Sequence, residues 1–200
     1  MDKEQVVLVI ILSVALLLAS FVTRKTSSPS SKILNRMSKL LLTAIIAVVL
    51  LFTYVLEICI ITSGSMSPTL AVSDHVFVNK FIYSFRRPQY GDVVVFQAPA
   101  KATNSEELWV KRIVGLPGDM ISVKAGRLFR NGLLINEPFV SQLMIGNMNP
   151  QQVPKGTVFV MGDNRNNSED SRDWGPLDMK LITGRANMIF SPASRLQYIR

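Results

Sequence analysis

The sequence predicts a mainly β protein, in which one antiparallel β domain follows two N-terminal segments that are apolar enough to form transmembrane helices. Two features of the 200-residue chain support this prediction. The composition is 48% hydrophobic and 18% charged, which is typical of a membrane protein with a water-soluble part. The apolar residues also change pattern, because uninterrupted runs before residue 61 give way to short alternating segments after residue 70.

The two apolar runs cover residues 6–22 and 40–56, and neither contains a charged residue. Each has 17 residues, the low end for a transmembrane helix, and uncharged neighbours can lengthen both. The five residues before the first run, MDKEQ, are not basic overall, and strong positive charge follows the run, so an uncleaved anchor is favoured over a signal peptide. We therefore expect a first transmembrane anchor in residues 1–22 and a second transmembrane helix in residues 40–61.

The segment between the runs, residues 23–39, carries basic residues and no acid. The basic residues are Arg24, Lys25, Lys32, Arg36 and Lys39. A short loop of this composition stays in the cytoplasm and can contact anionic lipid. The sequence thus predicts that residues 62–200 form a β domain on the extracytoplasmic side of the membrane.

The β domain is predicted from short segments that are rich in β-branched residues and separated by turn residues. These predicted strands cover residues 75–81, 92–97, 108–115, 120–126, 156–162 and 181–190. Asn131 and Gly132 stand between two further apolar segments, and both residue types tolerate positive φ. They predict a β-hairpin.

The remaining composition excludes several classes of protein. Lys and Arg give a net charge of +8 but do not gather on one predicted helix, and no zinc-finger or helix-turn-helix signature is present, so no nucleic-acid partner is expected. A single cysteine, Cys59, excludes an intramolecular disulfide, and we predict no metal and no cofactor. Cys59 is interpreted as a small buried hydrophobic residue, and His75 as a half-exposed strand residue.

Three stretches contain residues that could carry chemistry, and the first is residues 63–69. Ser63 and Ser65 flank Gly64 immediately after the second apolar run. A serine nucleophile needs an exposed hydroxyl and nearby donors for an oxyanion, and a turn at Gly64 could supply both. A loop that leaves a membrane uses the same residue types, so this stretch alone favours a linker.

The second stretch is residues 108–119, where Trp109, Lys111 and Ile113 share one face of a predicted strand. Lys111 could extend to water along its apolar neighbours, or it could be a desolvated general base. An unperturbed lysine is neutral only about one time in a thousand near neutral pH, and burial can lower its pKa by about 3 units. Arg112 could not serve as the base because guanidinium keeps its proton.

The third stretch is residues 162–176, which packs many polar and charged residues after the apolar segment that ends at residue 161. It could be a polar surface loop with Asx turns. It could also be a network that orients a catalytic group. The density of charge so close to a buried strand makes the network a fair alternative.

Together and in this order, "SGSMSPTL", "VKRIVGLPGD" and "GDNRNNSEDSR" resemble the signature boxes of bacterial type I signal peptidase, the membrane-bound serine-lysine leader peptidase. The resemblance covers the second apolar run and most of the following domain. It implies a largely antiparallel β fold and a multi-pass location in the bacterial plasma (inner) membrane. The catalytic domain, residues 62–200, would then lie on the extracytoplasmic side.

The resemblance also implies roles for individual residues. Ser65 matches the nucleophile and Lys111 the general base, while the Ser63 hydroxyl matches the group that joins the Ser65 amide in the oxyanion hole. Ser168 matches the serine that hydrogen-bonds the lysine and orients it.

A supporting ion pair and a set of substrate-binding residues complete these expectations. Asp170 and Arg172 match an ion pair that supports the site. Substrate-binding residues are inferred from closeness to the motifs, and they are Ile61, Met66, Leu70, Trp109 and Val110. Thr62 and Ser73 depart from the family pattern, in which proline and glycine are common, and these departures concern substrate preference or loop rigidity rather than the reacting groups.

The substrates implied by the resemblance are secretory precursors, cleaved after small residues at the first and third positions before the bond (Ala-X-Ala type). Beyond precursors and membrane lipid, the expected state is a monomer near the secretion translocon. Two alternatives remain. One is a specialised peptidase of the same clan, such as a pilin-maturing protease. The other is a membrane-anchored β module that binds extended peptides by strand addition.

Overall fold

The structure, a computed structural model, describes residues 29–50, 55–102 and 107–199. The chain divides into two compact units, Met1–Glu57 and Ile58–Arg200. The first predicted anchor, residues 1–22, lies outside the described residues, as does part of the second predicted helix.

The described part of the first unit contains helix α2, Pro29–Leu50. Its start corrects the predicted loop of residues 23–39, since proline favours the first turn of a helix. The second prediction also changes, because Leu56–Ile60 is strand β1 rather than the end of a helix that reaches residue 61. β1 contains two β-branched residues and hydrogen-bonds to strand β2 (His75–Asn79), so sheet pairing outweighs the apolar run there.

No helix in the described ranges has both the length and the apolar character needed to cross a membrane.

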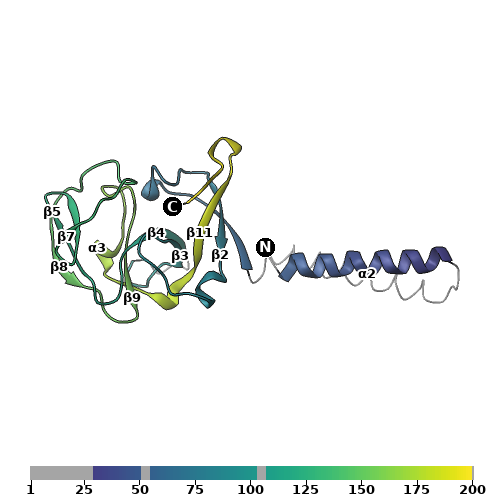
Figure 1. The fold of residues 1–200 in the computed structure, drawn as a ribbon. Coiled ribbons are helices and arrows are strands. Elements are labelled where there is room, and N and C mark those ends of the chain that lie inside the picture. The colour runs from purple at the N-terminus through teal and green to yellow at the C-terminus, as the bar shows by residue number, and fades with distance from the viewer. Residues whose placement is uncertain (1–28, 51–54, 103–106, 200) are drawn as a thin grey trace. The chain divides into compact units, whose positions relative to one another are not determined.

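The second unit contains two antiparallel sheets (Figure 1). The large sheet has the order β1-β2-β11-β3-β4-β9-β10, with β12 paired to β11, and the small sheet has the order β7-β6-β5-β8. The remaining strands of the large sheet are β2 (His75–Asn79), β3 (Val93–Gln97), β4 (Leu108–Gly115), β9 (Thr157–Met161), β10 (Leu177–Asp178), β11 (Ile182–Ser191) and β12 (Gln197–Tyr198). The small sheet consists of β5 (Met120–Lys124), β6 (Arg127–Arg130), β7 (Leu133–Leu134) and β8 (Met148–Gln152).

Short helices occupy the connections between the strands. They are α3 (Ser171–Trp174) and the 3₁₀ helices η2 (Gly64–Met66), η3 (Ile82–Ser84), η4 (Met179–Leu181) and η5 (Ala193–Arg195).

The predicted mainly β fold is confirmed, and each of the six predicted strands overlaps an observed one. The hairpin is also confirmed, because Asn131 and Gly132 both have positive φ, 56° and 80°, between β6 and β7. Strand β8 was not predicted. Its sequence, MNPQQ, contains proline and no β-branched residue, so only its pairing with β5 makes it a strand.

Strand β4 is buried in the middle of this unit, and its residues pack in different directions. Val110 packs against the apolar cluster that contains Ile61, Met66 and Leu70. Ile113 belongs to a second cluster together with Phe96 of β3. The two burial environments leave little water around the middle of β4, where Lys111 and Arg112 lie.

Candidate active site

Ser65 lies on η2, the single 3₁₀ turn that follows β1. The turn is fixed at both ends by apolar side chains, since Ile61 and Leu70 are both buried in the core. Met66 is also buried, and its carbonyl accepts a hydrogen bond from the Leu70 amide (2.9 Å). The serine-rich stretch is therefore a rigid turn, and the linker interpretation is wrong.

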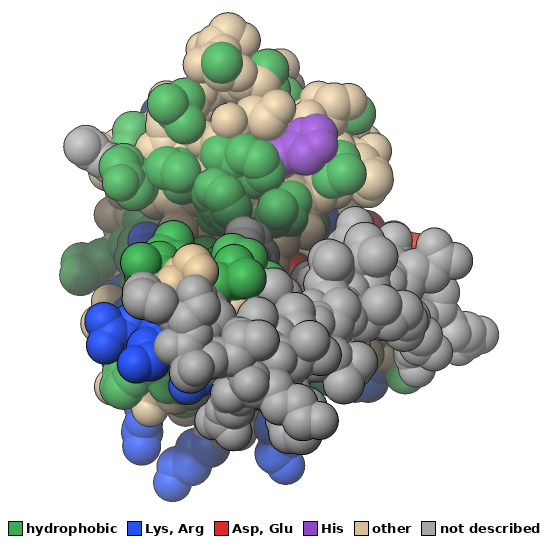
Figure 2. All heavy atoms as spheres, turned by 90° about the vertical axis from the view of Figure 1, so that its right-hand side faces the viewer, with side chains coloured by type: hydrophobic (Ala, Val, Ile, Leu, Met, Phe, Trp, Pro, Cys, Tyr) green, Lys and Arg blue, Asp and Glu red, His purple; other side chains and the backbone are tan. Residues whose placement is uncertain are grey.

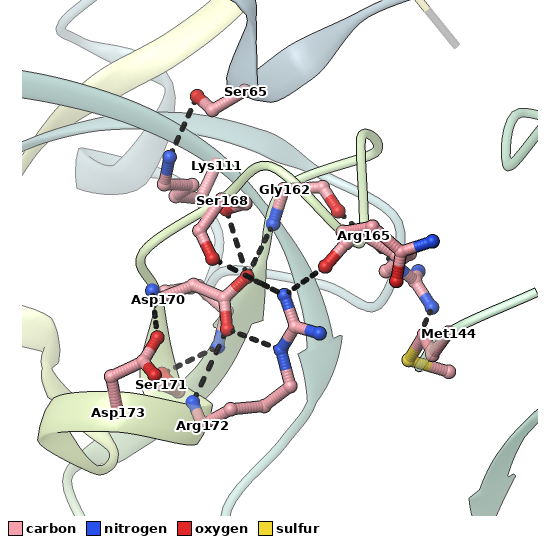
Figure 3. Close-up of polar contacts among 12 residues, drawn as sticks. Ser65, Lys111, Met144, Gly162, Arg165, Ser168, Asp170, Ser171, Arg172 and Asp173 are labelled. Atoms are coloured by element: carbon pink, nitrogen blue, oxygen red, sulfur yellow. Dashed lines mark hydrogen bonds and ion pairs between the residues drawn. The ribbon is translucent and has the colours of Figure 1, made fainter. Parts of the chain in front are cut away.

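Lys111 reaches the Ser65 hydroxyl from β4. Its Nζ donates a hydrogen bond to Ser65 Oγ at 2.7 Å (Figure 3), and the lysine is only 5% exposed. Lys111 pairs with Val94 of β3 across the sheet. Nζ also lies 5.7 Å from the centre of the Trp109 ring. Lys111 therefore does not extend to water.

Burial lowers the pKa of Lys111 from its ordinary value to about 8. Loss of hydration is the largest cause, because it penalises the charged ammonium. The carboxylates of Asp170 and Glu169 oppose this effect and raise the pKa, whereas the Arg172 guanidinium lowers it. A useful fraction of Lys111 is thus neutral near neutral pH and able to accept a proton.

Ser63 lies beside the same hydroxyl. Its Oγ is 3.2 Å from Ser65 Oγ. Ser63 is also the N-cap residue of η2, the turn that contains the Ser65 amide. A hydroxyl and a backbone N–H from one turn can converge on an oxygen atom that carries developing negative charge.

The stretch of residues 162–176 forms a charged network behind Lys111, as Figure 3 shows. Asp170 is completely buried and binds Arg172 through two hydrogen bonds of 2.8 Å. Asp170 also accepts from the Gly162 amide (3.0 Å) and from the Ser168 hydroxyl (2.9 Å). It caps α3 through the Arg172 amide (3.2 Å). The network therefore links the end of β9 to α3.

Ser168 lies between this network and the reacting pair. Its hydroxyl donates to Asp170 rather than to Lys111, so the predicted contact with the lysine is replaced by one to the carboxylate. A Cβ atom built on Gly162 would collide with Ser168 Oγ and with the Ser65 carbonyl oxygen. The absence of a side chain at Gly162 therefore leaves room for the Ser168 hydroxyl and for the Ser65 carbonyl group.

An open cleft of about 450 Å³ leads to the Ser65 hydroxyl. It is lined by residues 59–66 on one side and by residues 107–111 and 167–169 on the other. Four predicted substrate-binding residues, Ile61, Met66, Trp109 and Val110, line this cleft. Leu70 does not, because it is fully buried in the core beneath the turn.

Some cleft residues were not predicted as site residues. Cys59 was interpreted as simply buried, yet it is partly exposed and lines the cleft. Glu107, Asn167 and Glu169 line it as well. Sequence patterns could not identify them, because the cleft brings together three segments that are far apart in the chain. His75, by contrast, is partly exposed on β2, as predicted.

In the described ranges, no group of three or more His, Cys, Asp or Glu side chains is placed to hold a metal ion.

Comparisons with known proteins all point to the same family. The family described as signal peptidase, peptidase S26, matches residues 33–191. A probable signal peptidase I-2 of a Synechocystis species is 36% identical over 176 residues, which are 87% of this chain and 81% of that protein. Signal peptidase I P of Bacillus subtilis subsp. natto is 38% identical over 173 residues, 81% of this chain and 91% of that protein.

A plant protein is similar over a shorter region. Thylakoidal processing peptidase 1 of Arabidopsis thaliana is 43% identical over 143 residues, which are 68% of this chain and 42% of the plant protein.

Proposed function

The chain belongs to the signal peptidase family, peptidase S26, as a serine endopeptidase that removes signal peptides, and we propose that Ser65 and Lys111 form its catalytic dyad. One observation carries this proposal: the buried Lys111 Nζ lies 2.7 Å from Ser65 Oγ, on the wall of an open cleft. A lysine with a pKa of about 8 matches the requirement that a general base be partly neutral near its working pH.

The proposed acylation step follows from these positions. Neutral Lys111 takes the proton of Ser65 Oγ as the oxygen attacks the carbonyl carbon of the scissile bond. The Ser65 amide and the Ser63 hydroxyl stabilise the negative charge that develops on the carbonyl oxygen. Protonated Lys111 then donates its proton to the leaving nitrogen, the C–N bond breaks, and the mature protein departs.

The acyl-enzyme is hydrolysed by the same groups. Neutral Lys111 takes a proton from a water molecule, which attacks the ester carbonyl. The tetrahedral intermediate collapses, and Ser65 Oγ leaves and regains its proton from the lysine. Asp170 and Arg172 do not touch the reacting atoms. They keep the segment that carries Ser168 and Gly162 in place behind the lysine.

We propose that the cleft selects small residues at the first and third positions before the cleaved bond. Bulky apolar side chains, Ile61, Met66 and Trp109, form walls of the cleft. Ile61 and Met66 are also packed in the core, so these walls have little freedom to move away from a large side chain. A cleft of this kind accepts Ala-X-Ala sequences and excludes bulky residues near the scissile bond.

We also propose that the chain is anchored in the bacterial plasma membrane with residues 62–200 on the extracytoplasmic side. The two uncharged runs and the basic segment between them support this topology. The β domain offers an apolar surface as well. Figure 2 shows hydrophobic side chains gathered around the histidine, and Phe190 contacts both His75 (5.8 Å) and Phe77 (4.1 Å) between ring centres. An anchored monomer would meet membrane-held precursors close to their point of export.

Cleavage of a precursor tests this proposal. We expect the full chain to cut a secretory precursor after its signal segment, and Ser65→Ala to abolish the cut. Ser67→Ala is the matched control, because Ser67 lies on the same turn and should retain activity. Full activity of Ser65→Ala would show that the nucleophile lies elsewhere. Cleavage of many precursors, rather than one, would exclude a specialised peptidase.

A further inference from the structure

Asn164 contacts the turn that carries Ser65, although it lies 100 residues after Gly64 in the sequence. Its side-chain Nδ2 donates a hydrogen bond to the Gly64 carbonyl at 3.0 Å. Its backbone amide donates a second hydrogen bond to the Ser65 carbonyl, also at 3.0 Å. One residue thus holds the peptide group before Ser65 and the peptide group after it.

The first of these contacts bears directly on the oxyanion hole. The Gly64 carbonyl and the Ser65 N–H belong to the same peptide group, which is planar and trans. The two groups therefore point in opposite directions, and fixing the carbonyl fixes the direction of the N–H. The Ser65 N–H is the backbone donor that the proposed mechanism assigns to the oxyanion.

A hydrogen bond to a carbonyl also polarises the N–H of the same peptide group. The Gly64 carbonyl accepts two such bonds, one from Asn164 and one from the Ser67 amide (3.1 Å). Both bonds make the Ser65 N–H a stronger donor. The Ser67 bond belongs to the turn itself, whereas the Asn164 bond comes from another part of the chain and can be removed without altering the turn sequence.

Asn164 is itself held by buried ion pairs on both of its neighbours. Asp163 pairs with Arg112 at 2.7 Å, and both side chains are at most 1% exposed. Arg165 pairs with Glu137 at 2.6 Å, and both are buried. Because each neighbour is fixed by charge in the interior, the Asn164 amide has little freedom to move away from Gly64.

From this arrangement we propose that Asn164 is a positioning residue for the oxyanion hole: it orients and polarises the Gly64–Ser65 peptide group so that the Ser65 N–H points at the scissile carbonyl oxygen. The inference rests on the proposed role of Ser65. It assigns no proton transfer to Asn164, which touches neither Lys111 nor the substrate in this role. Asn164 stabilises the transition state, in which negative charge develops on the scissile carbonyl oxygen.

Asn164→Ala and Asn164→Leu test the proposal, since both remove the side-chain donor and keep the backbone amide. We expect kcat to fall about 10- to 100-fold, less than the loss of an entire oxyanion donor. KM should stay within about threefold, because the ground-state carbonyl depends little on this N–H. The pH at which kcat/KM reaches half its plateau should not move, since Lys111 is untouched.

Inhibitor binding provides a second readout. A peptide aldehyde that forms a hemiacetal with Ser65 places an oxyanion in the hole, whereas the cleaved product peptide does not. We expect the variants to weaken aldehyde binding by the factor seen in kcat and to leave the affinity for product peptide unchanged. Asn164→Gln keeps an amide donor on a side chain that is one methylene longer. It should recover part of the kcat that Asn164→Ala loses.

Asn166→Ala is the matched control, because Asn166 lies on the same segment and its Nδ2 also donates to a backbone carbonyl, that of Leu143 (2.9 Å). It should keep kcat within about twofold, while thermal unfolding reports the structural cost of losing such a bond. A kcat of Asn164→Ala equal to the control, or a shifted pH midpoint, would overturn the proposal. Activity that survives in Ser65→Ala would instead reject the dyad itself.

Discussion

Lys111 and Arg112 are consecutive cationic residues on one buried strand, yet their surroundings are opposite. Both are at most 5% exposed. Arg112 binds both oxygens of Asp163 (2.8 and 2.7 Å) and the Gly91 carbonyl (2.9 Å), and it stacks on the Phe139 ring. The hydrogen bond from Lys111 Nζ goes to a hydroxyl, that of Ser65.

The difference shows how one strand can provide both stability and reactivity. A buried cation that meets a carboxylate keeps its charge and holds the structure together. A buried cation without a carboxylate partner at hydrogen-bonding distance loses its proton more easily, and the pKa of Lys111 is lowered accordingly. Asp170 is near enough to raise that pKa, but its hydrogen bonds go to Arg172, Ser168 and Gly162.

The largest expected effect is the loss of activity in Lys111→Met. Methionine fills a similar volume but cannot accept a proton, so kcat should fall at least about 10⁴-fold. The folded protein should become more stable at pH 7. Because the pKa is lowered from 10.5 to about 8, protonation of Lys111 destabilises the folded state; the cost grows as the pH falls from 10.5 to about 8 and is complete below pH 8, at roughly 1–3 kcal/mol. Precursor cleavage and thermal unfolding measure the two effects, and retention of activity would contradict the assignment.

Arg112→Met should lower folding stability strongly and activity only weakly, the reverse of Lys111→Met. It leaves Asp163 as a buried carboxylate without its guanidinium, which costs about 3–5 kcal/mol of folding stability. The activity of the fraction that remains folded should stay within about tenfold of the unchanged enzyme. Adding Asp163→Leu removes the uncompensated charge and should restore part of the stability in urea unfolding. A double variant no more stable than Arg112→Met would argue against the ion pair as the cause.

Gly162→Ala tests the packing of Ser168 and Ser65 next to Lys111. The added methyl group would collide with Ser168 Oγ and the Ser65 carbonyl, and a displacement of the reacting groups by about 1 Å can cost about 10²-fold in rate. Gly184→Ala is the matched control, because its Cβ would lie 2.8 Å from the Asn79 carbonyl oxygen, away from the cleft. The control should lose stability and keep kcat. Equal losses of kcat in both variants would mean that general destabilisation is responsible.

The pH dependence of kcat/KM should report Lys111, whose Nζ contacts the attacking hydroxyl of Ser65. A base must be neutral to work, so kcat/KM should rise about tenfold per pH unit below pH 8 and level off above it. Rates with a peptide substrate between pH 6 and 10 give the midpoint. A rate that is flat over this range would show that another group is the base.

The smallest effect is expected for Glu169→Gln. The Glu169 carboxylate raises the pKa of Lys111, so its removal should shift the midpoint of the pH profile to lower pH. The shift should be modest because Glu169 is exposed. Glu107→Gln is the control, as Glu107 also lines the cleft but is not among the charges that act on Lys111. A shift of the same size in both variants would indicate a general effect of cleft charge.

Much of the fold and part of the site could be predicted from local sequence. Alternation of apolar residues identified the strands, and Asn131-Gly132 identified a hairpin, because both depend on neighbouring residues. The second helix was placed wrongly at its C-terminal end, since an apolar run does not reveal that Leu56–Ile60 will pair with β2. Leu70 was placed in the cleft for a similar reason, as closeness in sequence does not say which side of the turn a side chain takes.

The sequence by itself determined the chemical groups: a serine on a turn after an apolar run, a lysine between apolar neighbours, and a charged stretch after a buried strand. Only the tertiary structure decided which groups meet. Ser65, Lys111 and Asn164 belong to segments far apart in the chain, and their approach depends on how β1, β4 and β9 pack. The pKa of Lys111 was decided at the same level, because the loss of hydration that lowers it is produced by the whole interior and not by adjacent residues.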